Sequence, residues 1–175
     1  MEWIDLNPSI NTVDAVYIGK YLNFSTVFSQ DRIYRYTLVR ELGFSKKTLF
    51  FLCLNPSIAD EVKNDPTVTR CIGYAKSWGF GRLFVGNIFA YRSTDPAHLY
   101  TINDPVGIEN DKWIEMMAEH SDLTVGAWGN HGHLNDRYKE VLNRINNVYC
   151  LKKTKSGQPS HPLYLAKKLK PFPFT

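Results

Sequence analysis

The sequence has no apolar run that reaches the ~18 residues needed to cross a membrane. Its first residues, MEWIDLNPSI, lack the basic start and the apolar stretch of a secretory signal peptide. The 175 residues contain only three cysteines, too widely spaced for a zinc or iron–sulfur motif. From these absences we expect a cytoplasmic protein that binds no membrane and has no disulfide framework.

The sequence also lacks the common motifs of nucleotide-dependent enzymes and serine hydrolases. It contains no GxxxxGK[ST], no GxGxxG and no GxSxG. His131 and His133 are close enough to share a metal ion, but no third ligand stands at a telling spacing. We therefore expect neither an organic cofactor nor a metal ion.

What is present is an ordinary globular composition, with 43% hydrophobic, 14% aromatic and 22% charged residues. Enough core material is available to exclude a disordered chain. The length suits one domain, spanning residues 1–175. Residues 1–32 have weak periodicity, and we treat them as an N-terminal extension of this domain.

Positive charge is concentrated near the C-terminus, although the net charge is only +4. Residues 141–175 contain no Asp or Glu, and their seven basic residues are Arg144, Lys152, Lys153, Lys155, Lys167, Lys168 and Lys170. A basic segment of this kind favours a phosphate-bearing partner such as DNA or a nucleotide, although a solvated basic face is the alternative.

Four short apolar runs bounded by turn residues predict buried strands at 48–54, 83–90, 122–128 and 148–151. Helical patterns lie between and after them, at 68–78, 110–120, 136–145 and within 162–169. This alternation predicts a three-layer α/β/α domain around a central, mostly parallel four-stranded sheet. Residues 33–40 alternate and add an N-terminal edge strand.

Ligands of such folds bind beyond the carboxyl ends of the parallel strands. The loops that follow the four predicted strands, at 55–57, 91–93, 129–132 and 157–161, are all polar. Asn55 is either a turn residue or a ligand contact. Asn87, inside an apolar strand, is either bonded to backbone or presents its amide to a nucleobase. His161 is either a surface histidine or a donor toward developing negative charge.

Other side chains near these strand ends also have two interpretations. Asp60 and Asp65 follow the first strand and are either helix caps or carboxylates of the site. Tyr91 and Trp128 end strands and are either core residues or platforms that stack on a base.

Four motifs resemble those of the uracil-DNA glycosylase superfamily, over roughly residues 48–170. FFLCLNPS is similar to its first motif, with Asn55 and Pro56 in the arrangement of the mismatch-specific branch. LFVGNIFAYRS places the base-reading amide on Asn87, and LTVGAWGNHG is similar to the third strand and its small-residue loop. VYCLKKTKSGQPSHPLYL places the family histidine on His161.

The resemblance implies an enzyme that rotates a nucleotide out of the DNA duplex and hydrolyses its glycosidic bond. Asn87 would bind the base, His161 would stabilise the departing base, and Asn55 would position the water. The vacated stack would be filled by Leu163 or Tyr164, and phosphates would be held by Lys152, Lys153 and Lys155.

Two positions depart from the best-studied branch of that superfamily. An amide at Asn55 cannot take a proton from water, so either hydrolysis is slow or Asp60 or Asp65 supplies the base. Ser57 stands where that branch has a bulky aromatic residue, and a small residue there would admit a larger, modified base.

The chain also resembles a bacterial and phage family of unknown function, through LNPSIAD, DPTVTRC, NIFAYRSTDP, DPVGIEND, AWGNHG and SHPLYL. Our main hypothesis is a nucleobase N-glycosidase acting on DNA or on a nucleotide. The first alternative is a binding module of the same fold with little catalysis. The second is a metal-dependent phosphate-handling enzyme with Arg92 and residues 129–132 as an anion site. The sequence makes no prediction of oligomeric state.

Overall fold

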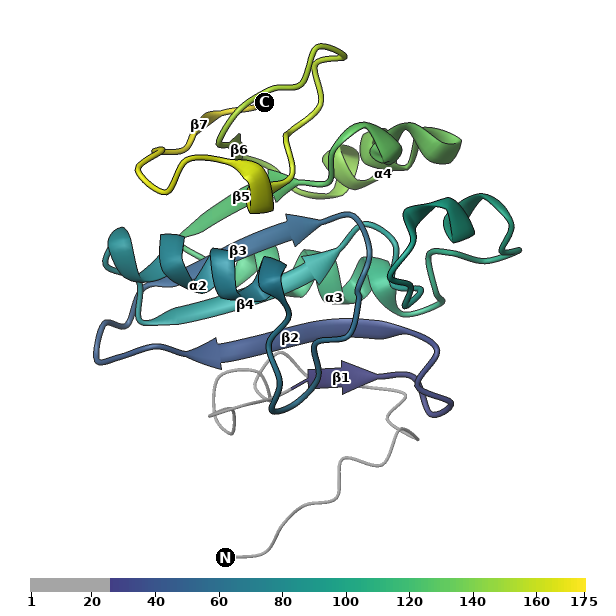
Figure 1. Cartoon of the computed structure of the whole chain (residues 1–175), viewed down its shortest axis with the longest axis horizontal. Helices are drawn as coiled ribbons and strands as arrows, with labels where there is room; N and C mark the ends of the chain where they lie inside the picture. The colour runs from purple at the N-terminus through teal and green to yellow at the C-terminus, as the bar shows by residue number, and fades with distance from the viewer. Residues whose placement is uncertain (1–25) are drawn as a thin grey trace, which may run out of the picture.

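The computed structural model describes residues 26–175, which form one seven-stranded sheet with three α-helices (Figure 1). The strands are β1 (Thr26–Phe28), β2 (Arg35–Glu41), β3 (Thr48–Cys53), β4 (Arg82–Asn87), β5 (Leu123–Ala127), β6 (Val148–Cys150) and β7 (Phe172–Pro173). The α-helices are α2 (Pro66–Ser77), α3 (Asn110–Glu119) and α4 (Arg137–Arg144). Short 3-10 helices lie at η1 (Pro96–Tyr100), η2 (Asn130–Asp136) and η3 (Pro162–Tyr164).

The sheet is mixed, with strand order β1-β2-β4-β3-β5-β6-β7. Its four middle strands, β4, β3, β5 and β6, pair in parallel. The pairings of β1 with β2, β2 with β4 and β6 with β7 are antiparallel. The structure therefore confirms the α/β class, whereas the sheet has three more strands than the predicted four-stranded core and is only half parallel by pairing.

Two local predictions were wrong. The strand predicted at 33–40 is not at the edge, because β2 lies between β1 and β4. The helix predicted within 162–169 is limited to the three residues of η3. In that segment the carbonyls of Ala166 and Leu169 accept hydrogen bonds from Tyr74 and Trp78 of α2, so they are bound to another element rather than to a further helical turn.

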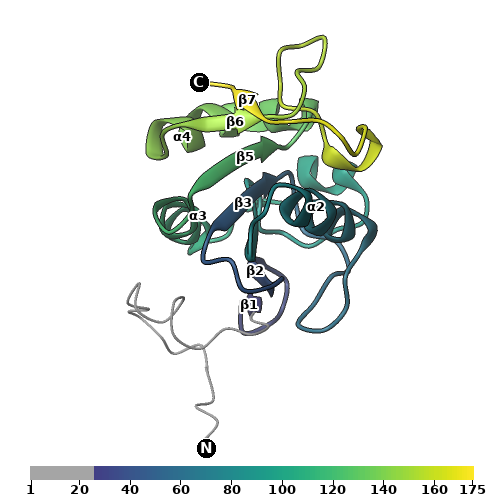
Figure 2. The ribbon, with the colours of Figure 1, turned by 90° about the vertical axis from the view of Figure 1, so that its left-hand side faces the viewer.

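Helices cover both faces of the sheet (Figure 2). All six residues of β3 are buried, as the apolar run predicted, and they alternate between the two faces. Phe51 packs with the buried residues of α2, whereas Phe50 packs with those of α3 and α4. The chain thus has two hydrophobic cores separated by one sheet.

Local signals fix the start and end of α2. Asp65 is its N-cap and accepts a hydrogen bond from the backbone N–H of Val68 at 2.8 Å, and Pro66 occupies the first turn. Gly79 follows the helix with a φ of 79°, a left-handed conformation that glycine adopts without strain. These features confirm the predicted start and stop signals, although the helix runs over Pro66–Ser77 and not over the predicted 68–78.

The connections of the parallel strands reverse direction between β3 and β5. After β3 the chain passes to α2 on one face, and after β5 it passes to α4 on the other face (Figure 2). Adjacent strands whose connections leave in opposite directions define the point at which α/β sheets bind ligands. The loops that follow β3, β4, β5 and β6 meet along this edge.

Candidate functional site

Asn55 joins the loop after β3 to the loop after β4. Its amide nitrogen donates to the carbonyl of Ser93 at 2.8 Å and to that of Pro56 at 3.2 Å. The backbone N–H of Ser93 in turn donates to the carbonyl of Pro56 at 2.9 Å. The side-chain oxygen of Asn55 accepts no hydrogen bond from residues 26–175, so it is available to a water or a ligand.

Asn87 is the last residue of β4, on the face of the sheet covered by α2, and only 2% of it is exposed. Its Oδ1 accepts a hydrogen bond from Nη2 of Arg35 at 3.4 Å. Its backbone carbonyl accepts one from Nδ2 of Asn110 at 3.0 Å. The amide nitrogen of Asn87 donates to none of the described residues, which leaves one donor of a fixed amide unused.

Arg35 is a residue of this site that the sequence reading missed. Its side chain is buried, and Nη1 donates to the carbonyl of Ala59 at 2.9 Å. Burial lowers its pKa to about 10, so it still carries its charge at neutral pH. Within residues 26–175 it has no ion pair, and its Nε has no partner. The sequence shows an arginine within a predicted strand, which can indicate a buried functional charge. We predicted 33–40 as an edge strand, where an arginine would be exposed, and so did not consider it.

Asp65 and His161 interact electrostatically beside Arg35. Asp65 is buried, and its charge acts on both Arg35 and His161. Burial lowers the pKa of His161, and the charge of Asp65 opposes that shift. Nδ1 of His161 accepts from the backbone N–H of Leu163 at 3.4 Å. An accepting Nδ1 assigns the proton of the neutral ring to Nε2, so the imidazole is a neutral donor at neutral pH.

The coupling between these two residues gives a direct test. Replacing Asp65 with Asn keeps a good helix N-cap but removes the charge that raises the pKa of His161. We expect the His161 pKa to fall further below its ordinary 6.5 in Asp65→Asn. NMR titration of the imidazole measures it, with Asp60→Asn as the control. An unchanged pKa in Asp65→Asn would contradict the arrangement.

Asp60 is directed toward its own turn rather than toward this group. It accepts hydrogen bonds from the backbone N–H groups of Val62 at 2.9 Å and Lys63 at 2.7 Å. Those bonds to Lys63 and Val62 hold the pKa of Asp60 below its usual value. A carboxylate stabilised in its charged form is a poor proton acceptor, so Asp60 is a weaker candidate for a general base than Asp65.

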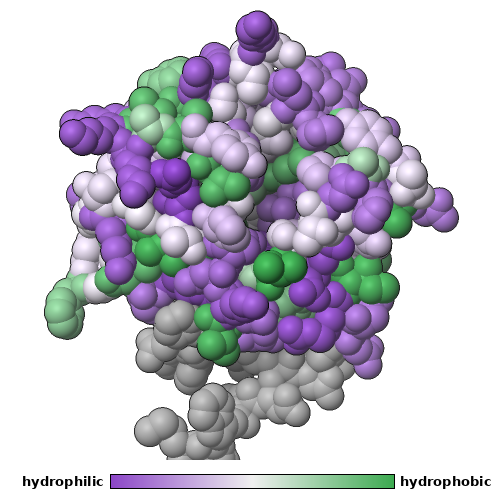
Figure 3. Space-filling view, viewed as in Figure 1, coloured by the Kyte–Doolittle hydropathy of each residue, from purple (hydrophilic) through white to green (hydrophobic). Residues whose placement is uncertain are grey.

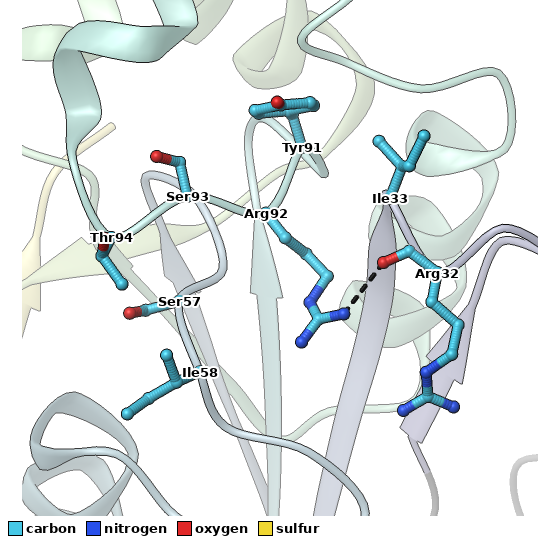
Figure 4. Close-up of a pocket in the computed structure, with 8 residues that line it drawn as sticks. All are labelled: Arg32, Ile33, Ser57, Ile58, Tyr91, Arg92, Ser93 and Thr94. Atoms are coloured by element: carbon cyan, nitrogen blue, oxygen red, sulfur yellow. Dashed lines mark hydrogen bonds between the residues drawn. The ribbon is translucent and has the colours of Figure 1, made fainter.

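Three predicted substrate-binding residues, Ser57, Tyr91 and Arg92, line one cavity of about 330 Å³ (Figure 4). The cavity lies between the loops after β3 and β4 and the turn between β1 and β2. Asn55, Asn87 and His161 do not line it. Asn55 borders it through its bond to the Ser93 carbonyl. The candidate residues therefore fall into two groups: Ser57, Tyr91 and Arg92 line the cavity with Asn55 at its border, whereas Asn87 and His161 lie outside it, and no described contact joins those two to each other.

Trp128 does not face either group, because only 1% of it is exposed. Its Nε1 donates to Oε1 of Gln158 at 2.7 Å. A Cβ added at Gly126 would lie 2.7 Å from the indole ring, and one added at Gly132 would lie 2.2 Å from it. Gly126 and Gly132 therefore make room for a core tryptophan, and the ring cannot stack on a base in this conformation.

Tyr164 and Leu163 lie on η3, which is fastened to α2 by the bond from Arg70 to the Leu163 carbonyl at 3.0 Å. Tyr164 is 87% exposed and is free to contact a ligand. Three predicted phosphate-binding residues are exposed on the loop after β6, and these are Lys152, Lys153 and Lys155.

His131 and His133 are engaged with aromatic residues. Nδ1 of His131 lies 3.0 Å from the hydroxyl of Tyr100, and the ring of His133 packs edge-on against Tyr138. Over residues 26–175, no group of three or more His, Cys, Asp or Glu side chains is placed to hold a metal ion.

Comparison with known proteins gave one match. The model of a family described as "Protein of unknown function (DUF1643)" matches residues 35–163. No curated protein and no solved structure matched, so these comparisons give no evidence for a place in the uracil-DNA glycosylase superfamily. Among the described helices, none combines the length and the apolar character that a membrane span requires. Because the match covers about three quarters of the sequence, this chain belongs to the DUF1643 family.

Proposed function

We propose that this chain is an N-glycosidase that acts on a nucleobase in DNA or in a nucleotide. One observation carries the proposal. A fixed amide, Asn87, is bonded to a buried cation that has no ion pair within residues 26–175, Arg35, and the charge of the buried Asp65 acts on both Arg35 and His161, whose imidazole burial keeps neutral. Asn87 ends β4, one of the parallel strands at whose carboxyl ends α/β folds bind ligands. The similarity of the strand-end motifs to those of uracil-DNA glycosylases also supports the proposal.

The free atoms of Asn87 define the edge of the base that fits. Arg35 occupies one lone pair of Oδ1, so Asn87 still offers one acceptor position and its Nδ2 donor. A pyrimidine with a carbonyl at C4 and a proton on N3, such as uracil or thymine, complements this pair. Ser57 is small, but it lines the cavity beside Arg92 and not a pocket shared with Asn87, so tolerance of a substituent at C5 rests on the motif similarity alone.

Bond breakage releases the base as an anion, and two groups are placed to stabilise it. The C1′–N bond breaks with its electron pair going to the base, while the oxygen of a water forms a new bond to C1′. The Nε2–H of His161 donates to the base, and the charge of Arg35 acts through a medium of low polarity. The neutral imidazole gives no proton away, because the product is the base anion.

Water activation depends on Asn55 and Asp65. The free Oδ1 of Asn55 accepts a hydrogen bond from the attacking water and orients it. The water's proton then passes to Asp65, the carboxylate whose charge reaches His161. Asp65 keeps one carboxylate oxygen free of described donors, although the other caps α2.

A binding module without turnover is the second candidate, and a specific feature favours it. The position directly after β3 holds an amide, and the nearby carboxylates Asp60 and Asp65 both accept backbone hydrogen bonds. Such a site would hold a base but accelerate hydrolysis weakly.

An assay of base release separates the two functions. Duplexes containing uracil, mismatched thymine or 5-substituted pyrimidines, and the corresponding nucleotides, are incubated with the full chain. We expect release that falls about tenfold or more in His161→Gln and Asn55→Ala. The control Arg82→Gln lies at the opposite end of β4 and should retain the rate. Binding without release supports the module, and the absence of both overturns the proposal.

A further inference from the structure

Two neighbouring arginines, Arg35 and Arg92, lie near the carboxyl ends of the parallel strands and have no carboxylate partner among the described residues. Arg35 and Arg92 form no ion pair with any residue from 26 to 175, whereas an ion pair is formed by Arg32, Arg82, Arg137 and Arg144. The backbones of the two residues lie close together, because the N–H of Arg35 donates to the Ala90 carbonyl at 3.0 Å and the N–H of Arg92 donates to the Ile33 carbonyl at 3.0 Å. The charge of Arg92 also helps to lower the pKa of Arg35. Two like charges in one region attract an anion.

Arg92 is held in place by its surroundings. Its backbone N–H donates to the carbonyl of Ile33 at 3.0 Å, and Nη1 donates to the carbonyl of Arg32 at 2.9 Å. Its guanidinium carbon lies 4.9 Å from the centre of the Phe28 ring. Figure 4 shows the side chain reaching between the Ile58 loop and Ile33. Its Nε is buried and has no partner in the described chain, so the guanidinium is fixed with unused donors.

The opposite wall of the cavity carries hydroxyl groups. Ser57 and Thr94 lie side by side across from Arg92 (Figure 4). Neither hydroxyl takes part in a hydrogen bond with the part of the chain that the structure describes. The described lining contains no Asp or Glu. A fixed guanidinium facing free hydroxyls, without a carboxylate, is suited to a phosphate.

The cavity shares a loop with the proposed base site. Ser57 lines the cavity, and two residues later the carbonyl of Ala59 accepts from Arg35, which holds Asn87. In a nucleotide, only one sugar separates the base from the phosphate. In this chain, only Ile58 separates Ser57, which lines the cavity, from Ala59, which contacts Arg35. We propose that the cavity around Arg92 binds a phosphate of the substrate, and this inference rests on the proposed action on nucleotides or DNA.

Binding measurements with three probes test the inference. Inorganic phosphate, thymidine 5′-monophosphate and thymidine are titrated into the full chain by calorimetry. We expect Arg92→Gln to weaken binding of phosphate and of the nucleotide by about tenfold or more, and to leave thymidine unchanged. Thr94→Val, which removes only a hydroxyl, should weaken the first two severalfold. A single-stranded oligonucleotide in place of the nucleotide shows whether the phosphate belongs to DNA.

The matched control is Arg82→Gln, because it makes the same change at the start of β4, where Arg82 pairs with Glu41 away from the cavity. It should bind all three probes as the unaltered chain does. Phosphate binding that persists in a folded Arg92→Gln, or is absent in the unaltered chain, overturns the inference. Loss of thymidine binding in Asn87→Leu tests the base site separately, so failure of one proposal is distinguishable from failure of the other.

Discussion

Replacing Arg137 with Met is expected to lower the free energy of unfolding by about 3 kcal/mol, whereas the same replacement at Arg35 should change it by less than about 1.5 kcal/mol. Both side chains are 2% exposed, so burial alone would predict equal effects. The difference follows from their partners, because Arg137 contacts two carboxylates and Arg35 contacts none within residues 26–175.

Arg137 is a structural residue. Its Nε donates to the carbonyl of Ile88 at 2.8 Å, and its guanidinium pairs with Asp111 and Glu140. It thereby fastens the segment after β4 to α3 and α4. Methionine at this position would leave Asp111, which is only 29% exposed, with Arg144 as its remaining ion-pair partner, and it would leave the Ile88 carbonyl without the Arg137 donor. Removing one member of a buried ion pair is among the most destabilising single changes.

Replacing Arg35 with Met has two opposite effects of similar size on the free energy of unfolding. Burial lowers its pKa from 12.5 to about 10, so its charged form is destabilised by about 3 kcal/mol in the folded chain. Methionine relieves that cost. It also leaves the Ala59 carbonyl and Oδ1 of Asn87 without their donor, at about 1–2 kcal/mol each. The terms nearly cancel, which is why we expect little net change.

Urea unfolding of the two variants at neutral pH measures the difference. The dependence of the unfolding free energy on urea concentration should be the same for both variants and the unaltered chain, since neither change alters the surface exposed on unfolding. If Arg35→Met destabilises the chain as much as Arg137→Met does, then Arg35 is a structural residue, and its place in the proposed site loses its support.

The elements that were predicted well from the sequence are those whose own residues determine where they begin and end. Helix α2 is marked by Asp65, Pro66 and Gly79, and β3 by an apolar run without polar interruption. The two- and three-residue strands β7 and β1 are too short to show a pattern, and they exist through pairing with β6 and β2. Strand β2 was recognised, but its position inside the sheet depends on pairing with β1 on one side and with the more distant β4 on the other.

The candidate site was predictable to the extent that parallel strands share an edge. That rule brings Ser57 and Arg92 to one cavity. It could not find Arg35, because that residue enters from β2, which runs antiparallel to β4. It also could not orient Trp128. An aromatic residue at a strand end can point inward or outward, and the space left by Gly126 and Gly132 decides this only in three dimensions.

Arg35→Met should lower the rate of base release by about 10²–10³-fold while leaving the chain folded. The reason is that a fixed charge in a buried site stabilises a developing anion far more than water does at that position. Arg35→Lys keeps a positive charge but loses the planar pair of donors toward Ala59 and Asn87, so it should restore only part of the rate.

The measurement is the single-turnover rate at saturating enzyme, which reports the chemical step rather than binding. Arg82→Gln is again the control, because it removes an equal charge from the neighbouring strand β4, at the end of that strand far from Arg35. Since Arg35→Met is expected to be nearly as stable as the unaltered chain, unfolding cannot account for a loss of rate. A rate within threefold of the unaltered chain would show that the buried charge takes no part in releasing the base, and His161 would then be the remaining described group placed to stabilise it.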